Sequence, residues 1–392
     1  MKKIILAAVA VSGLLFTSCS LDNDDQTIDK GNTGGEPTSQ NLAGNLTTNL
    51  TLKSGLDYTL TGALLVKDGA TLTIEPGVRV KALAGGTDVY LLVEKGGKIM
   101  ADGTSANPIV FTSNATSPKS GDWGGIIVNG KAPLSRQNGS NSNSTAEVNT
   151  AIEYGGNVAD DNSGILNYVK IEYTGARIDD EAEHNGLTLN GVGSGTIISN
   201  IAILNGDDDA IEFFGGTVDA TNILVVNAKD DMFDMTQGYV GTCTNLYGIR
   251  ENGFDAVTSD PRGVEADGNL DGNTPSDINQ SNFTINGLTI INNASGVKLS
   301  DGIKVRRGAT AKITNAYLEL GAGAIFSDVI DLKDSKGDAN DATDISSKGN
   351  TANGLDITDV KNTTTGGAKI DLTEGTSGGA DASAFAWTGY KF

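Results

Sequence analysis

The sequence predicts an all-β chain that winds into a single-stranded parallel β-helix, and three observations support this fold class. Short β-rich segments alternate with Gly, Asn and Asp, similar segments recur at a fixed spacing, and apolar residues alternate with polar ones within them. Such strands would also suit a β-sandwich array, which is the structural alternative. No stretch of ten or more residues combines a 3.6-residue period with helix caps, so we expect few helices.

The recurring segments set the length of one coil. Four of them align without gaps, at residues 185–189, 209–213, 231–235 and 301–305, and a similar segment follows at 328–332. The offsets are 24, 22, 70 and 27 residues, and 70 is taken as about three coils of roughly 23 residues. The third and fifth residues are apolar, as in Ile211 and Phe213, so we expect them to point inward and the fourth outward. Residues 45–370 would then form about twelve or thirteen coils.

The first residue of these segments is Asn or Asp in every case. It falls at the turn before the strand, where its side chain can accept hydrogen bonds from backbone N–H groups. Residues 371–392 follow the last predicted coil and are expected to form a C-terminal cap or tail, because the end of a solenoid is an open strand edge.

The first 44 residues predict export and anchoring. Residues 1–18 are predicted to be a lipoprotein signal peptide, because two lysines precede an apolar run that is too short to span a bilayer. Small residues before Cys19 resemble the lipobox of bacterial lipoproteins, although Phe16 replaces its usual Leu. This resemblance implies that Cys19 is lipidated. Residues 19–44 are predicted to be a flexible acidic tether, whose run at 20–25 resembles the surface-export signal of Bacteroidota lipoproteins.

Charge and cysteine content exclude several classes of function. Lys and Arg number 28 against 49 Asp and Glu, which gives a formal net charge of −21. This excess of acids argues against nucleic acid as a partner, because phosphate binding needs cations, and it favours a surface that attracts metal cations. Cys19 and Cys243 are the two cysteines, so neither a disulfide framework nor a cysteine-based metal site is expected.

Several glycine-containing strings between about residues 60 and 300 resemble a known family. They are residues 70–77 (ATLTIEPG), 121–126 (GDWGGI), 185–195 (NGLTLNGVGSG), 208–216 (DDAIEFFGG) and 262–267 (RGVEAD). They are similar to secreted right-handed parallel β-helix lipoproteins of Bacteroidota, with the pectin-lyase-like fold. The resemblance implies a right-handed coil and an envelope location. It carries over no catalytic residue, because that family has no assigned activity.

Stacked carboxylates are the first candidate site. An offset of 22 residues places Asp208 on Asp230, Asp209 on Asp231, and Glu212 on Asp234. Unit charges on coils about 4.8 Å apart repel by about 3 kcal/mol at an effective dielectric constant of 20. A bound cation would offset this repulsion, and Ca²⁺ suits carboxylate oxygens. The alternative is that the turn aspartates cap backbone amides and the outer acids are simply solvated.

A second candidate calcium site lies at residues 267–273. Asp267, Asn269 and Asp271 reproduce the opening of an EF-hand-like loop, with Gly272 in the sixth position. The Glu expected in the twelfth position is absent, and Ile278 stands there. An Asn-, Asp- and Gly-rich turn without calcium is the alternative interpretation.

An enzyme is the competing hypothesis. Asp208, Glu212 and Asp234 are candidate catalytic carboxylates for a glycoside hydrolase. Lys304 shares their strand register about three coils, or roughly 15 Å, further on, and is a candidate base for a calcium-assisted polysaccharide lyase. Phe214 has the outward parity of Glu212 and is the candidate for stacking on a sugar ring.

Three other side chains are assigned structural roles. Trp123 is predicted to pack between coils, with sugar stacking as the lesser alternative. His184 is the single histidine and is predicted to be a turn residue rather than a base. No other histidine is then available as the base of a Ser-His-Asp site. Cys243 is predicted to be a small buried side chain.

These inferences combine into one predicted protein. It is a lipid-anchored outer-membrane protein, displayed on the cell surface, whose β-helix binds an extracellular glycan or a partner protein, with Ca²⁺ as the candidate cofactor. A polysaccharide lyase or glycoside hydrolase is the first alternative. An adhesin or a purely structural spacer is the second.

Overall fold

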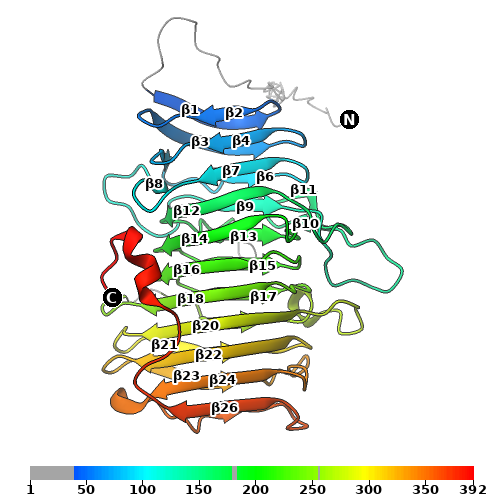
Figure 1. Ribbon diagram of the computed structural model, residues 1–392, viewed down its shortest axis with the longest axis vertical. Coiled ribbons are helices and arrows are strands. Elements are labelled where there is room, and N and C mark those ends of the chain that lie inside the picture. The colour runs from blue at the N-terminus through cyan, green and yellow to red at the C-terminus, as the bar shows by residue number, and fades with distance from the viewer. Residues whose placement is uncertain (1–38, 179–182, 255–256) are drawn as a thin grey trace, which may run out of the picture.

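Strand pairing joins segments that lie one coil apart. The computed structural model describes residues 39–178, 183–254 and 257–392, and its coils stack along one long axis (Figure 1). Twenty-four strands form one continuous parallel sheet, which winds into a right-handed β-helix. The hairpin of β10 (Ser144–Ala146) and β11 (Asn149–Tyr154) is antiparallel and separate from this sheet.

Three rows of strands run along the axis. The first row contains β2 (Leu50–Leu52), β4 (Thr71–Ile74), β7 (Lys98–Asp102), and the first halves of β12 (Gly164–Glu172), β14 (Ile197–Leu204), β16 (Ala220–Val226), β18 (Thr242–Arg250), β20 (Asn282–Asn292), β22 (Thr310–Leu320), β24 (Asp344–Asn350) and β26 (Lys369–Glu374). The second row contains the first halves of β1 (Ser39–Leu46) and β3 (Asp57–Val66), followed by β5 (Arg79–Ala82) and β8 (Ile109–Ser113). It continues with the second halves of the even-numbered strands from β12 to β26.

The third row carries the site described below. It contains the second halves of β1 and β3, then β6 (Leu91–Val93), β9 (Ile126–Asn129), β13 (Leu187–Asn190), β15 (Ile211–Phe214), β17 (Phe233–Thr236), β19 (Arg262–Ala266), β21 (Lys298–Lys304), β23 (Ile325–Asp331) and β25 (Val360–Lys361). Three short 3-10 helices complete the described chain: η1 (Leu270–Gly272), η2 (Thr351–Asn353) and η3 (Ala382–Thr388).

The coil count differs from the expectation. The first row has eleven strands, not twelve or thirteen, because several coils are long. Met100 pairs with Ile165, and a large insertion (residues 130–163) lies between them in the chain. The stretch between segments 231–235 and 301–305, taken as three coils, forms two, because Phe233 pairs with Val264 and Val264 pairs with Ile303. The helix also begins at Ser39, before the expected boundary at 45.

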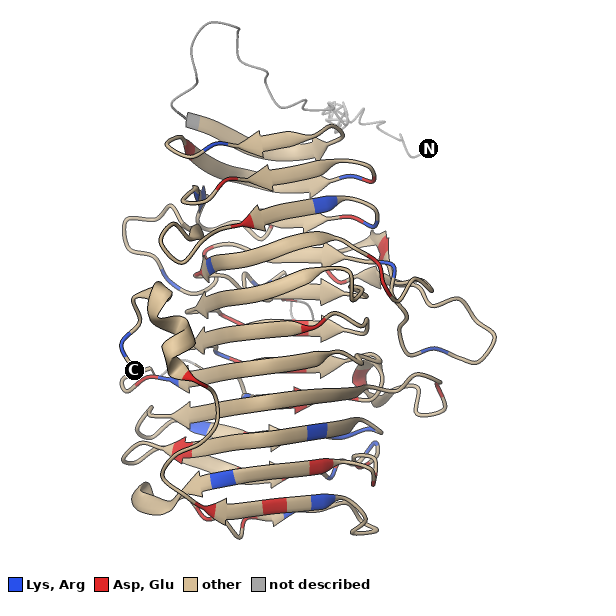
Figure 2. Cartoon of the chain, viewed as in Figure 1, with Lys and Arg blue, Asp and Glu red and all other residues tan. Residues whose placement is uncertain are grey.

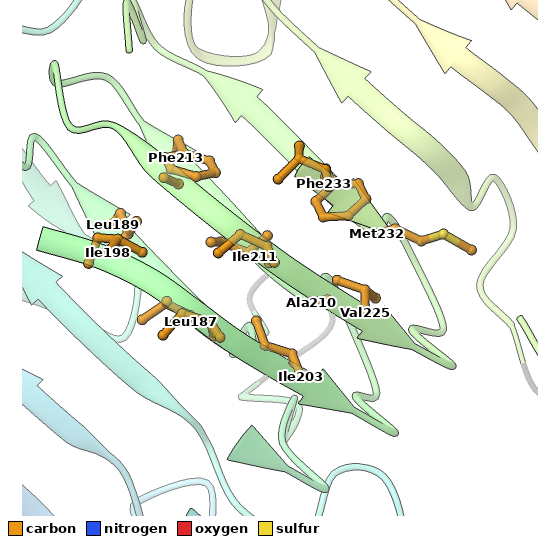
Figure 3. Packing of buried hydrophobic residues seen from close by; sticks show 14 of the residues in the cluster. Leu187, Leu189, Ile198, Ile203, Ala210, Ile211, Phe213, Val225, Met232 and Phe233 are labelled. Carbon is orange, nitrogen blue, oxygen red and sulfur yellow. The ribbon is translucent and has the colours of Figure 1, made fainter. Parts of the chain in front are cut away.

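Inward columns of apolar side chains hold the coils together. Leu187, Ile211, Phe233, Val264 and Ile303 succeed one another on adjacent coils, and each is fully buried. Figure 3 shows the first three pointing into the same core. Burial of each such side chain stabilises the fold by about 1.5–3 kcal/mol. The predicted alternation of inward and outward residues is therefore confirmed.

A column of left-handed residues forms the corner between the first and second rows. Tyr168, Asn200, Asn222, Asn245 and Asn315 all have a φ of about 50° to 63°. Asn tolerates this conformation better than other non-Gly residues. The side-chain amides also bond from coil to coil, since Asn222 donates to Asn200 (3.0 Å) and Asn245 donates to Asn222 (2.8 Å). Stacked polar turns thus fix the register of the coils.

The C-terminal segment, predicted to be a cap or tail, is a strap that leaves the last coil. The last coil extends to the end of β26, and residues 375–392 then run back along the outside, so that η3 lies beside β14, β16 and β18 (Figure 1). Phe385 is fully buried against outward side chains such as Leu224 and Tyr247. The Asn315 side chain donates to the carbonyl of Gly379 (2.8 Å).

The open edge of the last coil carries charged side chains and is not covered by the strap. Its final strand carries Lys369, Asp371 and Glu374, and Figure 2 shows acidic and basic residues interspersed on the coils near this end. Charged side chains on an edge strand oppose pairing with another chain. Among the described residues, no helix is both long and apolar enough to cross a membrane.

Candidate functional site: an acidic groove

A groove of about 320 Å³ lies over the third row, where β13, β15, β17 and β19 stack. Ten carboxyl groups and two guanidinium groups line it, together with the amide of Asn185. The carboxyls are those of Glu147, Glu183, Asp208, Asp209, Glu212, Asp230, Asp231, Asp234, Asp260 and Glu265, and the guanidiniums are those of Arg262 and Arg306. Acids therefore exceed bases by eight.

Outward positions of three successive strands supply the floor of the groove. Glu212 pairs in register with Asp234, and Asp234 pairs with Glu265. Alternation places these side chains opposite the buried core residues of the same strands. Asn185 donates from its amide to Glu212 (2.5 Å). The floor is thus a vertical column of three carboxyl groups on neighbouring coils.

Turn aspartates form a second column beside the first. The Asp209 carboxylate accepts a hydrogen bond from the backbone N–H of Asp231 (2.8 Å), and Asp231 accepts one from the N–H of Arg262 (2.5 Å). The predicted capping role of the first residue in each segment is therefore confirmed for these two. Their neighbours Asp208 and Asp230 are half-buried, and Asp230 accepts from the Thr258 hydroxyl (2.6 Å).

The two arginines stand at one end of the groove and are already engaged. Arg262 pairs with Glu265 and with Asp301, the latter at 3.0 Å. Arg306 pairs with Glu265 and with Asp267, the latter at 2.8 Å. Arg262 also pairs with Asp260 (3.0 Å), and a third arginine, Arg177, pairs with Glu183. The groove carboxyls that form no ion pair with a basic side chain among the described residues are Glu147, Asp208, Asp209, Glu212, Asp230 and Asp234.

Burial and mutual repulsion disfavour ionisation of these carboxyls. Burial raises the pKa of Asp209, with the charge of Asp231 adding to the effect. Burial likewise raises the pKa of Glu212, supported by Asp234, and that of Asp234, supported by Glu265. A carboxyl in this state is stabilised by a proton or by a nearby cation.

A second cluster of carboxyls, whose charges are paired with basic side chains, lies on the same row of strands, beginning two coils beyond Asp234. Asp301, Asp328 and Asp331 also stack closely enough to hold a metal ion. Each has a basic partner, however, since Arg262 binds Asp301 (3.0 Å), Lys304 binds Asp331 (2.7 Å) and Lys361 binds Asp328 (2.6 Å). The chain thus balances one stack of carboxyls with its own side chains and leaves the groove unbalanced.

The groove fits a divalent cation on two further grounds. Carboxylate oxygens of Asp209, Glu212 and Asp234 lie within 4.8 Å of one another. The Oδ1 atom of Asp234 is buried and has no hydrogen-bond donor among the described residues. Hard oxygen ligands in a flexible arrangement are what Ca²⁺ requires. A buried acceptor without a partner is costly, so a ligand at this atom would relieve the cost.

Comparison with protein families gives one match. The family described as "pectate-lyase like beta helix domain" matches residues 44–389, which is most of the chain. The chain belongs to this family. No curated protein and no solved structure matches the chain. The pectin-lyase-like fold expected from the glycine-containing strings is therefore confirmed for this β-helix domain.

The β-helix domain brings most of the predicted site residues together. Asp208, Asp209, Asp230 and Asp231 line the groove beside its carboxyl floor, as the 22-residue offset predicted. Lys304 lies elsewhere, two coils beyond Asp234 and not three, where it is buried and paired with Asp331. The prediction counted one coil too many, because the loops before β19 and β21 make both coils longer than the predicted 23 residues.

The EF-hand-like loop does not gather its ligands. The Asp267 carboxylate bonds to Arg306 and to Arg307 (2.6 Å to Nη1). The Asn269 side chain accepts from the backbone N–H of Thr274 (2.9 Å). Asp271 lies on η1, with a φ of 53°. The Asp267 and Asn269 side chains are therefore engaged by other residues of the chain.

The candidate sugar-stacking residue Phe214 is buried, which corrects the prediction. It does point away from the core, but the insertion covers it, and Leu134 and Tyr154 pack against it. The outward direction of the Phe214 side chain follows from the alternation along its strand, whereas its burial by the insertion could not be predicted. Trp123 is fully buried against Phe111, and its indole N–H donates to the carbonyl of Glu172 (2.8 Å). The predicted packing role of Trp123 is therefore confirmed, and sugar stacking is excluded.

His184 and Cys243 have no exposed reactive atoms. The Nε2 atom of His184 lies 2.8 Å from the carbonyl of Thr87, and burial lowers the pKa of His184 to about 4. Burial raises the pKa of Cys243 to about 12, and its sulfur lies 3.4 Å from the hydroxyl of Tyr239. The structural role predicted for Cys243 is confirmed, and His184 is a buried neutral residue.

Sequence reasoning missed several residues of the groove. Glu265 continues the column of Glu212 and Asp234, and its own string, residues 262–266, carries the same alternation. A search for alternation without a fixed period would have found it. Glu147 could not be found in this way, because the insertion brings it to the groove. Cys19 lies outside the described residues.

Proposed function

We propose that this β-helix domain binds acidic polysaccharide at the groove through a divalent cation, and that this cation is Ca²⁺. One observation carries the proposal: ten carboxyls line the groove with two arginines, and one more arginine, Arg177, pairs with Glu183, whereas every carboxyl of the neighbouring stack has a basic partner. The missing positive charge is therefore supplied from outside the chain. Asp209, Glu212 and Asp234 are the proposed ligands.

A uronate-containing glycan is the ligand class that best suits such a site. The protein carries a formal charge of −21, so an anionic polymer needs a cation between itself and the groove. Ca²⁺ takes six to eight oxygen ligands, and a few carboxylates leave positions for sugar carboxylate or hydroxyl oxygens. Arg262 and Arg306 are engaged by Glu265, which leaves them less suited to binding a sugar carboxylate directly. Membership of a pectate-lyase like family supports a carbohydrate ligand.

The proposed setting is the outer face of the cell envelope. Cys19 would carry the lipid anchor, and residues 20–38 would tether the first coil at Ser39. One lipidated cysteine with several acyl chains holds a protein on a membrane without a spanning helix. The long rigid coil would then present the groove to extracellular polymers.

A glycoside hydrolase is the second candidate, because one observation favours it. Burial raises the pKa of Glu212 and of Asp234, which keeps a protonated carboxyl available as a general acid. Asp208 would serve as the partner carboxylate, but burial raises its pKa as well, which disfavours the ionised form that this role needs. The lyase variant lacks the proposed base at the groove, because Lys304 lies two coils away and is paired with Asp331.

Binding and cleavage are tested together on the mature chain. Affinity electrophoresis through polygalacturonate and alginate, with Ca²⁺ or with a chelator, measures binding. Reducing-end and unsaturated-product assays on the same mixtures measure cleavage. We expect calcium-dependent retardation that is lost in Asp234→Asn and kept in the control Asp328→Asn, which changes the balanced stack. Retardation in neither condition would reject glycan binding and favour the adhesin or spacer hypothesis, whereas new reducing ends would favour the hydrolase.

A further inference from the structure

The β10–β11 hairpin reaches the groove from outside the coil. Two residues, Glu147 and Val148, form its turn, because Ala146 at the end of β10 pairs with Asn149 at the start of β11. Glu147 lines the groove together with residues of β15 and β17. It is the one carboxyl of the groove that belongs to the insertion and not to a coil. Glu147 itself stays exposed to solvent, at the rim.

Apolar contacts hold the base of this hairpin on the coil. Ala146 and Ile152 are buried against outward side chains of the third row, including Leu92 and Ile127. The Tyr154 hydroxyl donates to the Gln237 side chain (2.6 Å), which lies just after β17. The hairpin is therefore docked by contacts that do not depend on the charge of the groove.

Electrostatic repulsion, in contrast, pushes the turn of the hairpin away from the groove. Glu147 faces the carboxyl column that includes Glu212, and like charges in a confined groove repel. A cation held by the coil carboxyls reverses the sign of this interaction, because it attracts the carboxylate at the turn. The docked base and the charged turn thus form a segment whose closure depends on what occupies the groove.

We infer that the β10–β11 hairpin is a cation-dependent cover for the acidic groove, and that a cation held by the coil carboxyls attracts the Glu147 carboxylate at the turn. This inference rests on the proposed function, since it requires a cation in the groove. It adds a conformational consequence: loading the cation orders the turn over the groove and narrows the opening through which a glycan enters.

The hairpin offers its own control residue. Glu153 lies on β11, and its carboxylate faces Lys95 (3.5 Å) on the outer side, with its side chain 58 % exposed. Glu147→Gln and Glu147→Lys change the charge at the groove, whereas Glu153→Gln removes an equal charge from the same hairpin without touching the groove. All three substitutions are at exposed positions, so folding is expected to survive them.

Amide hydrogen exchange of residues 144–154 measures the cover, and calorimetric titration with Ca²⁺ measures the groove. We expect Ca²⁺ to slow exchange of the hairpin about tenfold in the wild type and in Glu153→Gln. In Glu147→Gln the rate is expected to be the same with Ca²⁺ and with chelator. In Glu147→Lys the hairpin is expected to be protected in chelator, because the new ammonium supplies the missing charge.

Calorimetry separates the two possible failures. Calcium binding without any change in hairpin exchange would overturn the cover and leave the proposed function standing. A calcium response that persists in Glu147→Gln would remove Glu147 from the mechanism. No calcium binding at all would overturn both the cover and the proposed cation site.

Discussion

Glu212 and Asp234 occupy equivalent positions on adjacent coils, and both side chains face the acidic groove. Neither has a basic partner in the ion pairs of the described residues, although Glu212 accepts from the Asn185 amide. Two like charges at about the spacing of neighbouring coils repel by about 3 kcal/mol at an effective dielectric constant of 20. The repulsion between these two residues leads to the first prediction.

Asp234→Asn is expected to stabilise the protein when divalent cations are absent. The substitution removes one carboxyl from the column, so the free energy of unfolding in chelator should rise by about 1–3 kcal/mol. In Ca²⁺ at 100 times its Kd this difference should shrink or reverse, because a ligand that binds the native state then stabilises the wild type by about 2.7 kcal/mol. Urea unfolding in both buffers checks this. Equal destabilisation in both would show that Asp234 has only a packing role.

The pH dependence of stability in chelator follows from the raised pKa values. Burial among like charges raises the pKa of Glu212 and of Asp234 above their values in the unfolded chain. Above the ordinary carboxyl range, the folded protein therefore holds more protons than the unfolded chain. Stability must then fall as pH rises from about 5 towards 8. Thermal unfolding across this range, with and without Ca²⁺, measures the slope, and Ca²⁺ is expected to flatten it.

His184 changes the pH dependence of stability in the opposite direction, and it does so at lower pH. Its pKa is lowered from 6.5 to about 4, so the stability that it provides is lost as pH falls through that interval. Above its ordinary pKa of 6.5 the His184 contribution to stability is complete, so the slope at higher pH comes from the carboxyls with raised pKa values. A Tm that rises steadily between pH 6 and 8 in chelator would contradict the raised pKa values of the groove.

The sequence was sufficient for the coil register but not for the whole site. The offset of 22 residues placed Asp209 and Asp231 on adjacent coils because a coil of three short strands has nearly constant length there. Glu265 was missed because the loop before it lengthens its coil, so that the partner of Asp234 lies further along the chain than the fixed offset predicts. Local periodicity thus predicts neighbours only where loops keep their length.

Contacts that depend on distant segments were not predictable. Phe214 has the alternation of an exposed residue, yet Leu134 and Tyr154 bury it because the insertion folds back onto the coil. The strap is a similar case, since Phe385 packs on β16 and β18, which belong to coils in the middle of the chain. No periodicity within residues 371–392 indicates that docking surface.

Phe214→Ala is expected to loosen the insertion and leave the coil intact. Removal of a buried phenylalanine side chain typically costs about 3–5 kcal/mol, and here the loss falls on the contact between the insertion and β15. Limited proteolysis should then cleave within residues 130–163, while circular dichroism keeps its β signal. The control Phe326→Ala removes a buried aromatic from β23, away from the insertion, and should leave its proteolysis unchanged.

Truncation after residue 374 is expected to destabilise the central coils and promote aggregation. The strap covers Leu224, Tyr247 and Ile249, and its loss exposes a contiguous apolar surface. Light scattering and thermal unfolding of the truncated chain measure both effects. Phe385→Ala should show a smaller shift in the same direction. A truncated chain that melts like the full chain would show that the strap is dispensable.

Cys19→Ser is expected to move the protein from the membrane fraction to the soluble fraction. The proposed anchor depends on acyl chains attached to this residue, and the described part of the chain has no helix that could span a bilayer. Cell fractionation with immunoblotting measures the change, and Ser18→Ala is the control. Retention of Cys19→Ser in the membrane would point to a different attachment.

The most direct measurement is anomalous X-ray diffraction from crystals of residues 20–392 soaked in Ca²⁺ or in its luminescent substitute Tb³⁺. We predict an anomalous peak in the groove, within bonding distance of Asp209, Glu212 and Asp234, and its loss in Asp234→Asn. An empty groove at saturating metal, with the ion elsewhere or nowhere, would contradict the cation site and the glycan binding proposed from it.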